Sequence, residues 1–265
     1  MTEVIVQSIH RVMHEIKRRR LEVLRVVDLT PRMRRITLGG PELAGFVSLG
    51  TDDHVKLLFA QNAAEQAALE TLVLGAGKDN GAMPVMQPAM RDYTPRRYDL
   101  DTLELDIDFV LHGDGPASTW AEQARPGQFL HIGGPRGSMI VPDMFDSYLL
   151  IGDETALPAI ARRLEGLPAN RRALVIVEVE NGAEQQLLES AAQIDVIWVL
   201  REGGKDNLLT TVKQLQVPSG NLYAWIATES KVSRQIRRVL LDEHGLNEQF
   251  VKAVGYWRLD DSEEE

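Results

Sequence analysis

The chain has 265 residues, 44% of them hydrophobic, a formal net charge of −10 and no cysteine. Without cysteine there are no disulfides, no thiolate iron–sulfur ligands and no cysteine nucleophile, so any redox chemistry requires a bound cofactor. The acidic balance disfavours general binding to nucleic acid or anionic membranes, because both require a net basic face. No apolar run approaches the roughly 20 residues that cross a bilayer, and residues 1–20 lack the charge order and cleavage site of a secretory signal, so we expect a cytoplasmic protein.

Residues 1–20 are expected to form a helical extension. The basic run at 17–20 is short and is followed at once by a strand pattern, which favours a solvated helix end. His10 and His14 are four residues apart, a spacing that can bind zinc on a helix, but no third ligand is apparent and we expect no metal site.

Residues 21–142 are predicted to form a small antiparallel β-barrel. Short alternating segments are separated there by Gly and Pro, which is typical of such folds. In the clearest segment, 103–111, every second residue is apolar and acidic residues occupy positions between them, so one face is predicted to be buried. Other strands are expected at 21–27, 34–40, 54–60 and 129–134. Residues 61–72 suggest a short helix, and residues 75–88 a mobile loop.

Residues 147–258 alternate between strand and helix patterns, which predicts an α/β domain with a parallel sheet. Residues 141–146 are a plausible linker, and residues 259–265 are an acidic tail. The expected strands are 148–153, 172–180, 195–201, 222–228 and 250–257. The expected helices are 155–165, 183–191, 207–216 and 230–243.

The segment RDYTPRRYD at 91–99 places arginine beside aromatic rings. Arg91 and Tyr93 share one face at strand spacing, Thr94 points to the other, and Pro95 limits further pairing. An arginine fork suits phosphate, a tyrosine ring suits a heteroaromatic ring, and a threonine hydroxyl suits a ring nitrogen, which together favour a flavin nucleotide. Alternatively, the arginines form surface ion pairs with the three nearby aspartates.

The segment HGDGPASTWA at 112–121 follows the alternating strand directly. Gly113 and Gly115 permit a tight turn, and Pro116 suits the first turn of a helix whose free backbone N–H groups would bind pyrophosphate. Alone this motif is weak, but the upstream arginine and tyrosine and the turn GGPRGS at 133–138 make the combination specific.

Five segments in this order, RDYTPRRYD, HGDGPAS, GGPRGS, GDETALPAI and GYWR, resemble the siderophore-interacting proteins, which are flavin-dependent ferric-siderophore reductases of the ferredoxin-reductase superfamily. The resemblance covers about residues 20–258. It implies an FAD-binding barrel at 21–142, an NAD(P)H-binding α/β domain at 147–258, and reduction of a ferric siderophore in the cytoplasm to release iron.

The resemblance also implies roles for individual residues. Arg91 and Arg96 would hold the FAD phosphates, Tyr93 would pack on the isoalloxazine and Thr94 would approach the flavin N5. The other FAD contacts would be His112 and the backbone of Gly115, Ala117, Ser118 and Thr119. Trp257 would screen the flavin face, and the ferric chelate would be bound by Lys56, Arg136 and Arg258.

The electron donor is the least defined partner. The turn GDETALPAI has Asp153 and Glu154 where a glycine-rich loop is usual, and these residues or Thr155 can simply cap the following helix. The resemblance nevertheless implies a nicotinamide-nucleotide site there, with Asp153 and Thr155. Arg201 and Lys205 suit a 2′-phosphate, which favours NADPH over NADH, and reduced ferredoxin is the alternative donor.

Two function classes follow. The first is a flavin enzyme that reduces ferric siderophores, and the second is a non-catalytic ferric-siderophore binding protein of the same fold. A serine hydrolase is excluded because no G-x-S-x-G motif occurs. We expect a monomer, since no feature requires an interface.

Overall fold

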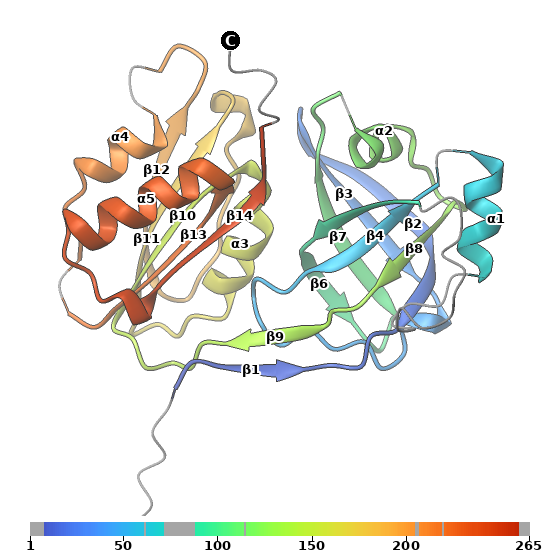
Figure 1. Ribbon diagram of the computed structural model, residues 1–265, viewed down its shortest axis with the longest axis horizontal. Coiled ribbons are helices and arrows are strands. Elements are labelled where there is room, and N and C mark those ends of the chain that lie inside the picture. The colour runs from blue at the N-terminus through green and yellow to red at the C-terminus, as the bar shows by residue number, and fades with distance from the viewer. Residues whose placement is uncertain are drawn as a thin grey trace, which may run out of the picture. The chain divides into compact units, whose positions relative to one another are not determined.

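The computed structural model describes residues 8–60, 62–71, 88–113, 115–204, 207–218 and 220–259. The chain divides into two compact units, one formed by Ser8–Val141 and the other by most of the chain from Pro142 onward (Figure 1). Most of the expected loop at 75–88, Lys205 and nearly all of the acidic tail lie outside the described residues. None of the helices in the described ranges combines the length and apolarity that a membrane span requires.

The first unit contains an antiparallel sheet of seven strands in the order β5-β4-β8-β2-β3-β7-β6. Its strands are β2 (Arg18–Thr30), β3 (Met33–Gly39), β4 (Val55–Phe59), β5 (Ala89–Tyr93), β6 (Pro95–Asp99), β7 (Glu104–Val110) and β8 (Phe129–Gly133). Strands β5 and β6 are the two edges of this sheet, yet only Thr94 separates them in the chain. The sheet must therefore curl until the end of β5 and the start of β6 meet at Thr94, and this curled sheet is the predicted antiparallel barrel with its seam at Thr94.

The core of the barrel confirms the alternation in the sequence. Leu105, Ile107 and Phe109 of β7 are fully buried, as the pattern at 103–111 predicts. Burial of each such side chain stabilises the fold by about 1.5–3 kcal/mol. Two helices accompany the sheet, α1 (Ala63–Thr71), which lies in the segment expected to be helical, and α2 (Pro116–Gln123).

The helix expected for residues 1–20 is wrong over its described part. Residues His10–Met13 form strand β1, which pairs antiparallel with β9 (Gly137–Ile140), and β2 already begins at Arg18. Pairing with a distant strand overrides the helix pattern, and the Nε2 atom of His14 lies 2.7 Å from the hydroxyl of Ser138. Among the described residues, no group of three or more His, Cys, Asp or Glu side chains is arranged to hold a metal ion.

The second unit is built on a parallel sheet of five strands in the order β12-β11-β10-β13-β14, as the alternating patterns predict. The strands are β10 (Ser147–Asp153), β11 (Arg172–Val179), β12 (Gln193–Leu200), β13 (Leu222–Glu229) and β14 (Val251–Trp257). The longer helices are α3 (Leu157–Glu165), α4 (Leu208–Lys213) and α5 (Ser230–Asp242). Helices α4 and α5 cover one face of the sheet and α3 lies against the other (Figure 1).

The strand order of this sheet changes direction at β10. The chain runs outward from β10 to β11 and β12, then returns to β13 on the other side of β10. Ligands of parallel α/β sheets bind beyond the carboxyl ends of the strands at such a switch point. Strand β10 is buried along its whole length, so its carboxyl end is held rigidly there.

One expected helix of this unit is absent. Residues 183–191 contain only the short 3-10 turn Gly182–Glu184, followed by non-helical chain. The hydroxyl of Ser190 donates to the carbonyl of Leu164 at 2.6 Å and accepts from the N–H of Ala192 at 3.1 Å. Such side chain to backbone bonds compete with helix formation, which explains why the helix pattern fails here. Leu187 of this segment is 87% exposed.

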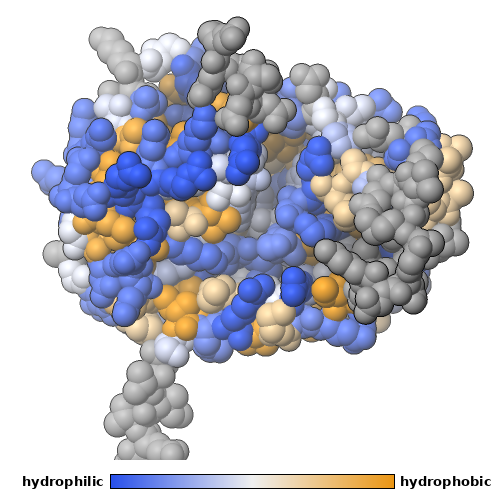
Figure 2. All heavy atoms as spheres, in the orientation of Figure 1, coloured by the Kyte–Doolittle hydropathy of each residue, from blue (hydrophilic) through white to orange (hydrophobic). Residues whose placement is uncertain are grey.

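On the face of the molecule drawn in Figure 2, apolar side chains occur in separate groups among hydrophilic ones.

Candidate functional site

The seam of the barrel carries the arginine–tyrosine segment. The ring of Tyr93 packs against Phe109 with 4.6 Å between centroids, and burial raises the pKa of the Tyr93 phenol well above its ordinary value. Thr94 is buried at 7% exposure, whereas Arg91 is exposed. The segment therefore presents an exposed arginine beside an aromatic ring that the core holds in place.

The alternative of surface ion pairs applies to other members of this segment. The Nζ atom of Lys56 is 2.8 Å from Asp92, and Arg97 is 3.9 Å from Asp99. Within the described part of the chain, the Arg91 side chain makes one hydrogen bond, to the carbonyl of Met90 at 2.9 Å. Arg91 is thus left available for a ligand, whereas two of the aspartates already have partners.

Two glycines with positive φ lie directly before the start of α2. Gly113 and Gly115 have φ of 84° and 89°, which favours glycine, and a Cβ at Gly113 would meet nothing within 4 Å. Gly115 is the N-cap of α2, and no side chain caps this helix end. Free backbone N–H groups at a helix N-terminus bind phosphate, so the open turn fits the FAD pyrophosphate.

The predicted contacts around this turn differ in exposure. Ser118 is fully buried and its hydroxyl accepts a hydrogen bond from the N–H of His112 at 3.0 Å. Ser118 therefore shapes the turn with its side chain, and like buried Ala117 it offers a ligand only its backbone. His112 and Thr119 are exposed and offer their side chains as well.

The glycine-rich turn after β8 carries Arg136, which is exposed. The carbonyl of Gly134 in this turn accepts a hydrogen bond at 3.3 Å from Arg19, which is only 5% exposed. The solvated helix end expected at 17–20 is therefore wrong for Arg19, because β2 begins earlier and turns this side chain inward. The signal was present in the sequence, since Arg19 has the same alternation as buried Leu21 and Val23.

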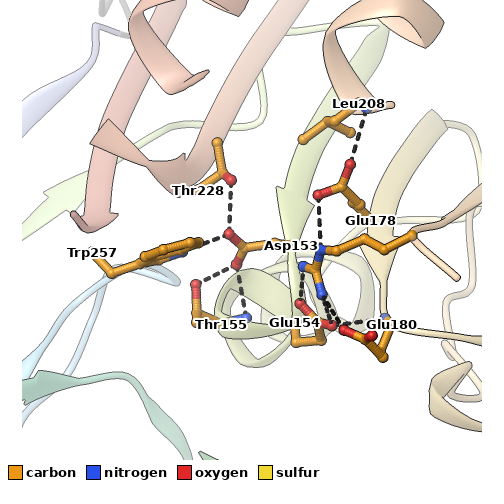
Figure 3. Close-up of polar contacts among 9 residues, drawn as sticks. Asp153, Glu154, Thr155, Glu178, Glu180, Leu208, Thr228 and Trp257 are labelled. Carbon is orange, nitrogen blue, oxygen red and sulfur yellow. Dashed lines mark hydrogen bonds and ion pairs between the residues drawn. The ribbon is translucent and has the colours of Figure 1, made fainter. Parts of the chain in front are cut away.

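In the second unit, Asp153 ends β10 at the switch point of the sheet and is 1% exposed. Its Oδ1 accepts from the N–H and hydroxyl of Thr155, at 2.9 and 2.5 Å. Its Oδ2 accepts from the hydroxyl of Thr228 and from the indole Nε1 of Trp257, both at 2.7 Å (Figure 3). Burial raises the pKa of the Asp153 carboxyl even though these bonds favour its charged form. Both oxygens thus face protein donors rather than a nucleotide.

A second polar network lies one residue further along the chain. Arg201 donates to Glu154 through Nη1 and Nη2, at 2.6 and 2.5 Å, and also contacts Glu178 at 3.1 Å and Glu180 at 3.4 Å (Figure 3). Burial lowers the pKa of Arg201, but the bond and charge of Glu154 outweigh it, so the net shift is upward. Arg201, which was expected to bind a 2′-phosphate, is thus already bound to three carboxylates. Lys205, the other residue expected there, lies outside the described residues.

The end of β14 carries the remaining candidates. Trp257 is 40% exposed, and the following Arg258 is exposed. The carbonyl of Trp257 accepts from the hydroxyl of Ser230 at 2.9 Å, so both the main chain and the indole of this residue are held.

An antiparallel barrel with an open glycine turn before a helix, followed by a parallel α/β unit with polar groups at its switch point, is the arrangement of two-domain flavin and nucleotide reductases. Comparison with known sequences refines this class. The profile of the siderophore-interacting FAD-binding domain matches residues 22–139, and that of the siderophore-interacting protein matches residues 145–260. The chain belongs to the siderophore-interacting protein family.

Three similar proteins extend the comparison. The NADPH-dependent ferric-chelate reductase of Escherichia coli is 36% identical over 93% of this chain and 95% of its own. The ferric vibriobactin reductase ViuB of Vibrio cholerae is 31% identical over 93% of this chain and 91% of its own. The crystal structure of a siderophore utilization protein from T. fusca has a TM-score of 0.83 and 37% identity, covering 96% of this chain and all of that one.

Proposed function

We propose that this protein is an FAD-dependent ferric-chelate reductase that passes electrons from NADPH to the Fe(III) of a ferric siderophore and thereby releases Fe(II). The observation that carries the proposal is the open glycine turn at Gly113 and Gly115 before the uncapped N-terminus of α2. It lies in the segment that matches the FAD-binding profile of the family. Both relatives named as reductases are similar over nearly the whole chain.

In this proposal the barrel seam and the glycine turn both contribute to the FAD site. Arg91 and Arg96 bind its phosphates, Tyr93 packs on the isoalloxazine and Thr94 directs its hydroxyl to the ring. The turn contributes His112 and the backbone of Gly115, Ala117, Ser118 and Thr119. Bound FAD supplies chemistry that the side chains lack, since it accepts a hydride as an electron pair and gives electrons up singly.

The ferric chelate is the substrate. The ferric complexes of catecholate and citrate siderophores are negatively charged. A protein with a net charge of −10 therefore requires local positive side chains to attract them. Lys56 and Arg136 supply exposed positive charge in the first unit, and Arg258 supplies it in the second. Fe(II) binds hard oxygen donors less tightly than Fe(III), so reduction itself releases the metal.

The electron donor in the proposal is NADPH, as in the name of the Escherichia coli relative. The carboxyl edge of the parallel sheet is its proposed site, where Asp153 and Thr155 act as a structural network at the switch point. NADH and reduced ferredoxin are the competing donors. We further propose that the protein works in the cytoplasm as a monomer.

The second candidate is a non-catalytic ferric-siderophore binding protein. It differs from the first in one visible property, because a binder without flavin is colourless. The exposed guanidinium of Arg91, which donates a hydrogen bond to the carbonyl of Met90, favours the enzyme, since a binder has no need of a phosphate ligand at the seam.

The test begins with a visible spectrum of the purified protein, followed anaerobically by NADPH and then by a ferric catecholate with a ferrous-specific trap. A flavin spectrum that bleaches and recovers as Fe(II) appears supports the reductase. A bound flavin that neither NADPH nor NADH bleaches indicates ferredoxin, and a colourless protein that still binds the chelate supports the binder.

A pair of variants separates the cofactor site from general charge effects. Arg91→Ala should lower FAD retention roughly tenfold or more, because a charge-assisted bond to phosphate is lost. Arg97→Ala removes an exposed arginine of the same segment whose partner is Asp99, and it should retain FAD as the wild type does. Equal FAD content in both variants would remove Arg91 from the proposed site.

A further inference from the structure

We infer that Asp153 is a positioning residue for Trp257, and that its carboxylate fixes the aromatic end of β14 rather than binding a nucleotide. The inference deepens the proposed function and rests on it for the substrate-binding role of Arg258, the residue that directly follows Trp257. The contact itself lies within one compact unit and stands without that role.

The geometry of the carboxylate shows how rigid the contact is. Three donors other than the indole hold Asp153 in place, namely the N–H and hydroxyl of Thr155 and the hydroxyl of Thr228 (Figure 3). The side chain is 1% exposed, so solvent does not compete for it. The Nε1 of Trp257 therefore meets, at 2.7 Å, an acceptor whose position is already determined.

A capping role alone does not explain an acid here. Asparagine caps a turn as well as aspartate does, and it avoids the cost of burying a charge. Asp153 has that cost, since burial is the main cause of its raised pKa. What only a carboxylate provides is two acceptor oxygens, one for Thr155 and one for Thr228 and Trp257.

The indole needs this acceptor because it is otherwise poorly restrained. Trp257 is 40% exposed, so packing covers only part of the ring. The bond from Ser230 to the carbonyl of Trp257 fixes the main chain but not the side-chain torsions. Asp153 thus selects one orientation of the ring and orders the chain that leads directly into Arg258.

Asp153→Asn tests the inference with an isosteric change. The Asn oxygen is expected to stay on the immobile N–H of Thr155, which turns the amide NH₂ toward Thr228 and Trp257. The Thr228 hydroxyl can rotate and accept from it, but the indole N–H can only donate and loses its partner. Thr228→Val is the matched control, because it removes a bond to the same buried oxygen and leaves the indole bond in place.

Two measurements on the holoprotein separate positioning from stability. The first is acrylamide quenching of the Trp257 emission, obtained by subtracting the spectrum of Trp257→Phe. The second is steady-state kinetics with a ferric catecholate, which gives KM and kcat separately. FAD content and the urea midpoint are measured in parallel. We expect Asp153→Asn to increase quenching and to raise KM about tenfold, the change that a lost hydrogen bond to a charged group supports, with FAD content unchanged.

The controls decide the interpretation. Thr228→Val should lower the urea midpoint and leave both quenching and KM unchanged. Trp257→Phe should raise KM as Asp153→Asn does, and the double variant should be no worse than Trp257→Phe alone. Quenching that Asp153→Asn leaves unchanged, or equal effects of Asp153→Asn and Thr228→Val on quenching and KM, would overturn the inference. If the wild type does not reduce ferric chelates, the proposed function fails, and the quenching comparison still decides whether Asp153 positions Trp257.

Discussion

Arg201 and Glu154 form a two-point ion pair that links the carboxyl ends of two strands of the parallel sheet, β12 and β10, across the strand between them. Arg201 follows β12, Glu154 follows β10, and the intervening strand β11 contributes Glu178 to the same guanidinium. The Glu154 side chain is 11% exposed and that of Arg201 is 34% exposed, so solvent screens this pair only in part.

The first prediction concerns stability. Arg201→Met should lower the free energy of unfolding by about 2 kcal/mol, because it leaves the nearly buried Glu154 without its positive partner and, among the described residues, with only the N–H of Glu180 as a donor. The partial exposure of Arg201 keeps the loss below that of a fully buried pair. Urea unfolding measures the loss. The control is Arg171→Met, whose partner Asp143 is 50% exposed, and this variant should lose under about 1 kcal/mol. Equal losses would show that the network adds nothing beyond a surface pair.

The second prediction concerns the nucleotide. One arginine faces three carboxylates, which leaves a net charge of −2 where a 2′-phosphate is expected to bind. Glu180→Gln should therefore strengthen binding of 2′,5′-ADP roughly fivefold, or about 1 kcal/mol, relative to 5′-ADP. Calorimetry with the two nucleotides measures the ratio. Glu189→Gln, an exposed change elsewhere in the unit, should leave the ratio unchanged. A ratio that is also unchanged in Glu180→Gln would place the 2′-phosphate away from Arg201.

The third prediction concerns the phosphate cradle. A methyl group at Gly113 meets no neighbour, yet φ of 84° strains any other residue, by roughly 1–2 kcal/mol. Gly113→Ala should therefore reduce FAD retention during dialysis, either through this strain or by occupying the open turn. Gly182→Ala places a methyl group in equally open space without a positive φ, and it should retain FAD fully. Full retention in both variants would argue against the turn as the pyrophosphate site.

The fourth prediction concerns the substrate. Lys56 is paired with Asp92 at 2.8 Å, and both side chains are about half exposed. Asp92→Asn should lower the KM for an anionic ferric chelate about twofold, because it frees one positive charge, and it should change stability by less than about 1 kcal/mol. A neutral ferric chelate should show no change. Glu15→Gln, which frees Lys17 in another exposed pair, is the control, and an equal effect there would assign the change to net charge alone.

The fifth prediction concerns pH. The pKa of Asp153 is raised in the folded protein above its ordinary 3.8, so between these two values the folded state holds the proton more strongly than the unfolded chain. Stability from this group is therefore fully present below pH 3.8 and declines as the pH rises through the folded pKa. As the pH rises through this range, the free energy of unfolding of the wild type should therefore fall relative to that of Asp153→Asn. A difference that is constant with pH would show that the carboxyl is not perturbed.

The sequence predicts those elements whose pattern is local. Alternation identifies β7 through Leu105, Ile107 and Phe109, and strand–helix alternation predicts the parallel sheet correctly. Patterns fail where distant partners decide the structure. The pairing of β1 with β9 replaces an expected helix, and the bonds of Ser190 replace another.

The candidate site divides in the same way. Glycines and prolines act through backbone conformation, so the turn at Gly113 and Gly115 is readable from the sequence. The ion pairs of Arg201 are not, because Glu154 follows β10 whereas Glu178 and Glu180 lie at the end of β11, and only the strand order brings these two ends beside Arg201 after β12. Nor is the bond between Asp153 and Trp257, whose residues are far apart in the sequence.

The link at Thr94 has a consequence for how this barrel tolerates change. Because one residue connects the two sheet edges, an inserted residue would have to be absorbed within β5 or β6, and a shift of one position exchanges the inward and outward faces of a strand. Tyr93 and Tyr98 pack on the core from either side of the link. A shift of one position would turn one of these rings out of the core and bring a neighbouring side chain into its place. The single-residue link therefore constrains the spacing from Arg91 to Arg96 more tightly than an exposed loop would.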